Sequence, residues 1–162
     1  ETQMGMFDKI FKKKFENKER TLDRNDPVYR NNLKIATAAL LVLMAHADDQ
    51  FTDLEHTKIT FLLKKRFGIQ DAEVEALLIE CKDQIIPETQ VQETLKFIDK
   101  NFYFDEKYDL MKYLYMLMLA DMDLSVHEVK LFTKISVALG INKLALETIK
   151  KDVERENDNY HP

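Results

Sequence analysis

The chain is poor in the residues that make tight turns and covalent cross-links. Its 162 residues include three glycines, three prolines, one cysteine and no tryptophan. So few glycines and prolines leave little material for the turns that many short strands would need. The single thiol, Cys81, excludes an internal disulfide and a cysteine-based metal cluster. Because 45% of the residues are hydrophobic, enough to build a core, we expect a compact single domain of the all-α class.

The chain also lacks an excess of positive charge and any long hydrophobic run. Its net charge of -5 argues against a nucleic-acid partner, which would need a basic surface. No stretch approaches the roughly 18 to 20 continuous apolar residues of a membrane span, and no signal-peptide pattern is found. We therefore expect a cytoplasmic protein.

Residues 6–20 are predicted to form a short basic amphipathic helix, followed by a polar linker to residue 25. We favour docking of its aromatic stripe on the domain's own core. The alternative is a peripheral contact with an anionic membrane surface, which for a bacterial protein would be the inner membrane. The expected division is this N-terminal segment over residues 1–25, a helical domain over residues 26–157 and a tail over residues 158–162.

Helix start and stop signals divide the domain into about seven or eight helices with short connections. The two most apolar helices should lie in the middle of a compact multi-helix array, because they need cover on all sides. The predicted helices run from Pro27 to about Ala47, from Thr52 to Gly68, from Asp71, from the residues after Pro87, from Asp105, from Ser125 to Gly140 and from Lys143 to about Arg155.

One pattern occurs twice, as "AHADDQFTDLEHTKITFLLKKRFGI" and as "LMLADMDLSVHEVKLFTKISVALGI". Each copy contains an apolar helix, Ala-Asp, an apolar residue, a hydroxyl residue, a glutamate three positions later and a helix that ends in Gly-Ile. The repeat predicts two packed copies about a pseudo-twofold axis. At a constant offset of 73, the first-copy residues Ala47, Asp48, Phe51, Thr52 and Glu55 correspond to Ala120, Asp121, Leu124, Ser125 and Glu128.

Part of this pattern has a local explanation. Thr52 with Glu55, and Ser125 with Glu128, fit the capping box in which a hydroxyl and a carboxylate satisfy helix-end amides. The apolar residue before each cap would act as a hydrophobic staple. The two glutamates alone are therefore weak evidence for a function.

The aspartates of the two turns have no such explanation. Asp48, Asp49, Asp121 and Asp123 add negative charge where the preceding helix ends, which the helix dipole disfavours. One interpretation is that they bond the amides of their own turns or reach a lysine such as Lys58 or Lys130. The other is a divalent cation site, because calcium, magnesium and manganese prefer clustered carboxylates.

A lone EF-hand cannot be that site, because Val126 occupies the glycine position of the loop and Glu128 comes four positions too early. A site shared between the copies remains. Zinc ranks below the harder cations, since none of the nearby histidines occupies equivalent positions in the two copies. The candidate ligands are Asp48, Asp49, Glu55, Asp121, Asp123 and Glu128.

The doubled motif, carried by "ADDQFTDLE" and "ADMDLSVHE" with their trailing helices, resembles the tellurite-resistance TerB family over about Leu33 to Lys150. It is also similar to the membrane-proximal domain of DjlA-type co-chaperones. The family's turn reads Ala-Asp-Gly, whereas Asp49 and Met122 stand here in the glycine position. The resemblance implies an all-helical, non-catalytic domain with an acidic metal-binding site. It also implies a role in bacterial stress response with protein partners, often near the membrane.

No phosphate-binding glycine loop, HExxH pattern or serine nucleophile elbow is present in the sequence. A metal-dependent hydrolase is disfavoured, because no nucleophile or positive clamp lies beside the acidic turns. The basic segment "LLKKRFG" is interpreted as a solvated helix end. Two hypotheses remain: a cation-binding sensor or adaptor, and a metal-free protein-interaction module that docks at a membrane-associated complex.

Overall fold

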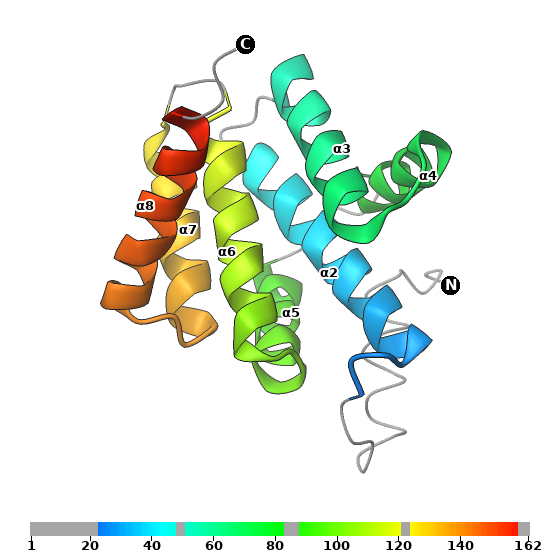
Figure 1. Cartoon of the computed structure of the whole chain (residues 1–162), viewed down its shortest axis with the longest axis horizontal. Coiled ribbons are helices and arrows are strands. Elements are labelled where there is room, and N and C mark those ends of the chain that lie inside the picture. Colours follow the sequence, from blue (N-terminus) through cyan, green and yellow to red (C-terminus); the bar gives the residue numbers. More distant parts are fainter. Residues whose placement is uncertain (1–22, 48–50, 83–87, 121–123, 159–162) are drawn as a thin grey trace.

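The computed structural model describes residues 23–47, 51–82, 88–120 and 124–158, and within these ranges it contains helices and no strand (Figure 1). This confirms the predicted all-α class. The predicted helix over residues 6–20 and residues 159–162 of the predicted tail lie outside the described residues, whereas Asp158 is the last residue of the final helix. The described helices are α2 (Pro27–Ala45), α3 (Asp53–Phe67), α4 (Asp71–Lys82), α5 (Glu88–Asn101), α6 (Phe104–Met118), α7 (Val126–Ala138) and α8 (Lys143–Asp158).

Helices α2 and α6 form the centre of the molecule, as their apolar sequences predict. Every residue from Ile35 to Val42 in α2 is buried, and so is every residue from Leu114 to Met118 in α6. The polar member of the first run, Thr37, donates its hydroxyl to the carbonyl of Leu33 at 2.7 Å, so its burial leaves no unpaired donor. Helices α3 and α4 cover one side of this pair, and α7 and α8 cover the other (Figure 1).

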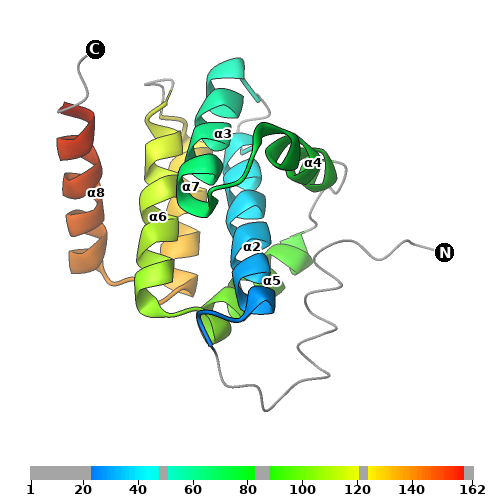
Figure 2. The same cartoon turned by 45° about the vertical axis from the view of Figure 1, so that its right-hand side comes forward.

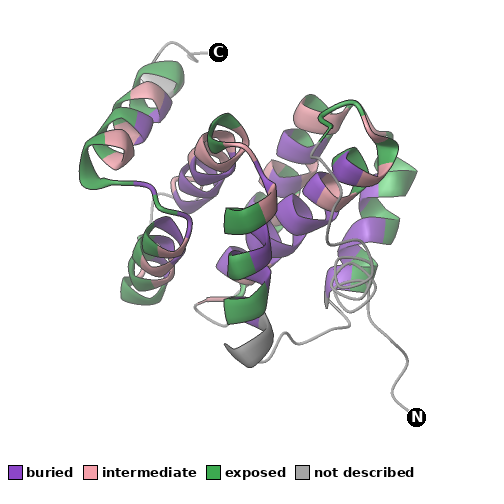
Figure 3. Cartoon of the chain, turned by 90° about the horizontal axis from the view of Figure 1, so that it is seen from below, coloured by how far each residue is buried: buried purple, intermediate pink, exposed green. Residues whose placement is uncertain are grey.

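The outer helices show the expected amphipathic pattern, with buried residues toward the centre and exposed residues outward (Figure 3). In α4, Val74, Leu78 and Cys81 are buried at helical spacing. Burial, with a smaller effect from Glu80, raises the pKa of the Cys81 thiol to about 12. Cys81 is therefore an inert core residue, because a thiol with that pKa holds almost no thiolate near neutral pH.

Most helix ends follow from local sequence signals. The Asp26 carboxylate accepts from the Val28 amide at 2.8 Å, with Pro27 in the first turn of α2. Helix α3 stops at Gly68, whose φ of 65° is a left-handed conformation that glycine adopts without strain. The side chain of Asn142 accepts from the Ala145 amide at 2.8 Å and starts α8.

The start of α6 differs from the prediction. The helix begins at Phe104 after Tyr103, which makes no side-chain capping bond, whereas Asp105 was expected to open it. The Asp105 carboxylate instead accepts two hydrogen bonds from Arg24, at 2.7 and 2.6 Å. A partner 81 positions away therefore takes the carboxylate that the local pattern assigned to the helix end.

Candidate functional site

The predicted acidic turns connect helix ends that lie at one end of the molecule. Helices α2 and α6 finish there, and α3 and α7 begin there, at the upper end in Figures 1 and 2. Helix α2 also contacts α7, and α6 contacts α3. The predicted pseudo-twofold repeat and the shared site stay predictions, because four of the six candidate ligands lie outside the described residues: Asp48, Asp49, Asp121 and Asp123.

Glu55, in the first copy, lies in a complete capping box. The Thr52 hydroxyl accepts from the Glu55 amide at 3.2 Å, and the Glu55 carboxylate accepts from the Thr52 amide at 3.1 Å. The glutamate is only 3% exposed. Burying a carboxylate is costly unless hydrogen bonds compensate for the lost water, and this box supplies one of them.

Glu128, in the second copy, has the same burial and a related cap. The Ser125 hydroxyl accepts from the Glu128 amide at 3.1 Å and lies 3.3 Å from the Glu128 carboxylate, close enough to donate to it. Glu128 is also 3% exposed. The complete capping box is therefore confirmed at Glu55, whereas in the second copy the Ser125 cap is confirmed and the Glu128 carboxylate faces the Ser125 hydroxyl. Both carboxylates lie inside the protein surface at the same end of the bundle.

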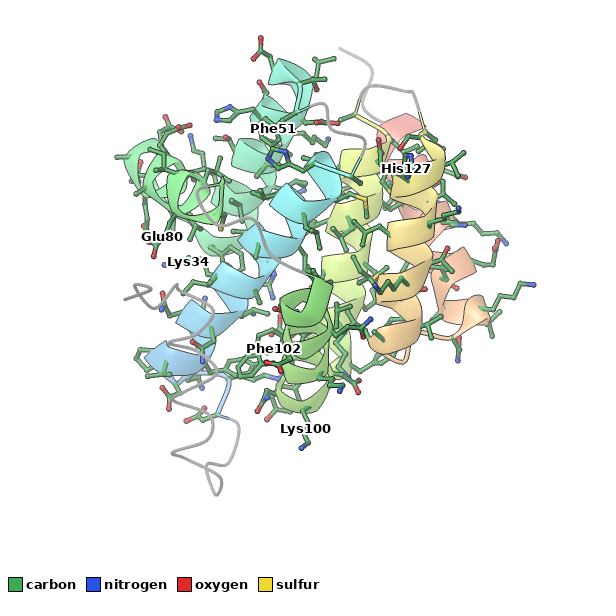
Figure 4. The ribbon with its side chains drawn as sticks, turned by 180° about the vertical axis from the view of Figure 1, so that it is seen from behind. Lys34, Phe51, Glu80, Lys100, Phe102 and His127 are labelled. Carbon is green, nitrogen blue, oxygen red and sulfur yellow. The ribbon has the colours of Figure 1, made fainter. Side chains whose placement is uncertain are left out.

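The residues before the caps differ between the copies. Phe51 packs against the core and stacks on His46, with ring centroids 5.0 Å apart and planes 23° apart. It also meets His56 edge to face at 6.1 Å, which matches the expected staple contact across the first turn. Leu124, at the corresponding position of the second copy, is 47% exposed. Figure 4 shows Phe51 and His127 at this end of the molecule.

The histidines have ordinary surroundings, as expected. The Nε2 atom of His56 lies 3.0 Å from a carboxylate oxygen of Glu75, and His46 and His127 are exposed. Within the described ranges, no three histidine, cysteine or acidic side chains gather closely enough to hold a metal ion. Of the predicted ligands, that finding concerns Glu55 and Glu128 alone.

A comparison with known families decides the classification. The family model described as tellurite resistance protein TerB matches residues 34–151. The chain belongs to the TerB family. No curated protein and no solved structure gave a match.

The match agrees with the resemblance carried by the doubled motif and makes this chain a tellurite-resistance-type domain. TerB is not, in general, a family of enzymes. None of the helices described in this TerB domain combines the length and apolar character needed to cross a bilayer.

The other end of the TerB domain contains a basic pocket that the sequence patterns did not predict. It lies where α2 and α6 begin and α3 ends. Arginines from three separate segments line it, together with one acidic and three other side chains. The lining residues are Arg24, Tyr29, Arg30, Leu33, Arg66, Phe67 and Glu106.

Two ion pairs hold arginines at this pocket. Arg66 bonds Glu106, and the two side chains are only 26% and 12% exposed. Arg24 lies over the Tyr103 ring, with its guanidinium carbon 3.8 Å from the ring centroid, while Asp105 holds it through two hydrogen bonds. The expectation of a solvated basic helix end is therefore wrong for Arg66, although Lys64 and Lys65 are exposed.

Sequence reasoning missed the pocket because its residues are far apart in the chain and carry no shared motif. Arg66 and Glu106 are 40 positions apart, and Arg24 and Asp105 are 81 apart. The only available signal was local: two arginines, Arg24 and Arg30, on either side of a predicted helix start.

Proposed function

We propose that this TerB domain binds a divalent cation through its two acidic turns and acts without catalysis as a sensor or adaptor in bacterial stress response. The observation that carries the proposal is the matched burial of Glu55 and Glu128. Each is 3% exposed and lies one turn into a helix that begins at the same end of the bundle. Two buried carboxylates at corresponding positions supply hard oxygen atoms beside turns rich in aspartate.

The composition of the proposed site indicates which cations it would take. All six candidate ligands are carboxylates, which suit calcium, magnesium or manganese, and zinc ranks lower because His46, His56 and His127 are not equivalent between the copies. A cation bound by both turns would join the α2–α3 connection to the α6–α7 connection. Its binding energy would then favour one arrangement of the two helix pairs, which is what a sensor needs.

Calorimetric titration with calcium, magnesium, manganese and zinc tests the proposal. We expect saturable heat for at least one of the first three ions and its loss in the double variant Asp48→Asn with Asp121→Asn. A control with the same change in charge is Asp71→Asn with Asp99→Asn. Both control aspartates are exposed, and each pairs with a single lysine at 2.8 or 2.7 Å. Unchanged heat in the first pair, or equal loss in both pairs, contradicts a shared cation site.

The metal-free interaction module is the second candidate, and an exposed apolar surface on α7 favours it. Val126, Val129 and Val137 are 66%, 45% and 73% exposed, and they follow a helical spacing on that helix. Absence of heat with all four ions would favour this alternative. A membrane contact is the alternative to core docking for residues 6–20, and stronger pelleting of the full chain with anionic vesicles than of a chain that starts at Thr21 would favour it. Equal pelleting would contradict that contact.

A further inference from the structure

The basic pocket has more positive charge than its lining balances. Three arginines line it against one carboxylate, and Asp105 compensates Arg24 from outside the lining. Among the described residues, the guanidinium of Arg30 makes no ion pair and no hydrogen bond. One positive charge is therefore left over after both ion pairs are counted.

The guanidinium groups also have unused donors. Each arginine carries five N–H groups in a plane, and the bonds to Asp105 occupy two of those on Arg24. One bond is formed between Arg66 and Glu106. The remaining donors approach the pocket from the start of α2, from the residues before it and from the end of α3. A ligand with acceptors on several sides can use them together, whereas a planar group can use fewer.

Tyr29 provides an independent observation at the same pocket. Its side chain is 7% exposed, and its buried O–H donates to no acceptor among the described residues. Its ring is fixed edge to face against Phe102 at 5.6 Å and Tyr103 at 6.1 Å. Figure 4 shows Phe102 at this lower end of the bundle. Leaving a buried O–H donor unpaired costs about 1 to 3 kcal/mol, so the position calls for a partner that the described protein does not supply.

The electrostatic surroundings connect this hydroxyl to the pocket charges. Burial raises the pKa of Tyr29, and a weaker backbone hydrogen bond from Tyr103 to the hydroxyl oxygen opposes that change. The charge of Glu106 acts in the same direction as burial, and that of Arg24 acts against it. A tyrosine hydroxyl is protonated at neutral pH even at its ordinary pKa of about 10, and the upward shift keeps it so, which leaves its O–H available as a donor.

The helix directions add to this field. Helices α2 and α6 both begin at this end, so the positive ends of their dipoles point toward it. The end of α3 contributes the opposite sign, but Lys64, Lys65 and Arg66 lie in its last turn. The combined electrostatic field of the helix ends and the basic side chains favours an anion at the pocket.

We propose that this pocket binds a phosphate group, with the unpaired charge of Arg30 compensating its charge, the unused donors of Arg24 and Arg66 bonding its oxygens, and the Tyr29 hydroxyl donating to one of them. A tetrahedral phosphate can accept from donors on several sides, whereas a carboxylate accepts mainly within one plane. The phosphate belongs either to a soluble molecule or to a lipid headgroup. The proposal is independent of the proposed cation site, whose candidate ligands lie beyond the other end of α2 in the chain.

Calorimetry with inorganic phosphate is the first test, with sodium chloride added to hold the ionic strength constant. We expect saturable binding by the full chain, about 10-fold weaker in Arg30→Gln because a charge-assisted hydrogen bond is lost. The matched control is Arg155→Gln, which removes an exposed arginine in the last turn of α8 and should change binding less than 2-fold. Absence of saturable binding, or equal effects of the two variants, overturns the proposal. Acetate binding as tight as phosphate binding overturns the preference for phosphate.

Tyr29→Phe removes only the hydroxyl and keeps the ring contacts. We expect about 5-fold weaker phosphate binding. A melting curve with and without phosphate provides a second readout. If the hydroxyl has no ligand, Tyr29→Phe will raise Tm equally in both conditions and the proposal fails. If the hydroxyl bonds the phosphate, phosphate will raise the Tm of the parent chain more than that of the variant.

Vesicles distinguish the two sources of phosphate. Co-sedimentation is measured with phosphatidylcholine vesicles, with and without phosphatidic acid. Arg30-dependent pelleting that inorganic phosphate inhibits assigns the site to a headgroup, and calorimetric binding of inorganic phosphate without pelleting assigns it to a soluble ligand. Two results together contradict any role of the pocket. The parent chain gives no heat with phosphate, and Arg30→Gln and Tyr29→Phe leave its pelleting unchanged.

Discussion

The two ends of α2 are built from different kinds of interaction. At its C-terminal end, neighbouring helices begin with bonds between residues three positions apart, as in Thr52 with Glu55 and Ser125 with Glu128. At its N-terminal end, ion pairs join residues 40 and 81 positions apart. The first kind belongs to single helices, whereas the second connects α3 and the residues before α2 to the start of α6. The same helix therefore ends in a local arrangement on one side and a tertiary one on the other.

The largest effect should come from the partly buried ion pair at the basic end. Replacing Arg66 with alanine leaves Glu106, 12% exposed, without its charged partner, and we expect the free energy of unfolding to fall by about 2 kcal/mol. Urea unfolding at neutral pH measures this loss. The control Arg155→Ala should cost less than about 0.5 kcal/mol, because that arginine is exposed.

A double-mutant cycle sharpens this prediction. Removing both partners should cost less than the sum of the two single losses, because no unpaired charge is left behind. Additive losses in Arg66→Ala and Glu106→Ala would show that the pair contributes nothing as a pair. The contrast between the two ends would then rest on packing alone.

The caps at the other end should give smaller and nearly equal effects. Thr52→Ala and Ser125→Ala each remove one bond to a helix-end amide, and each should lower the free energy of unfolding by about 1 kcal/mol. Thr133→Ala is the control, since that exposed hydroxyl bonds a carbonyl within the helix at 2.9 Å and alanine favours helix. A loss at Thr133 equal to that at Thr52 would contradict a specific capping role.

This difference explains how much of the fold could be predicted from the sequence. Asp26-Pro27, Thr52 with Glu55, and Gly68 determine helix ends through neighbours in the chain, and all of these ends were confirmed. The start of α6 was predicted one residue late, because a distant arginine takes the carboxylate of Asp105. Local patterns cannot include such a partner.

The same limit applies to the candidate sites. Glu55 and Glu128 could be selected because the motif occurs twice at one spacing, and the Thr52 and Ser125 caps beside them were confirmed. Tyr29, Arg30 and Arg66 belong to no motif, and only packing brings them together at one pocket. A repeated local pattern thus leads to the acidic end, whereas the basic end becomes visible only once helix packing is known.

The smallest effect concerns the exposed pair at the basic end. The hydrogen bonds from Arg24 hold the pKa of the Asp105 carboxyl below its usual value, so this pair stabilises the fold above the unfolded pKa of about 3.9. That stabilisation is lost as the pH falls through the lower, folded-state pKa. We expect Arg24→Gln to raise the Asp105 pKa, as measured by a carboxyl NMR titration, and to lower stability at neutral pH but not below the folded-state pKa.

Because the two side chains are 45% and 61% exposed, added salt should shrink this difference, whereas it should leave most of the Arg66 effect unchanged. An Asp105 pKa that is the same in both chains would mean that the long-range contacts of this end depend on Arg66 and Glu106 alone.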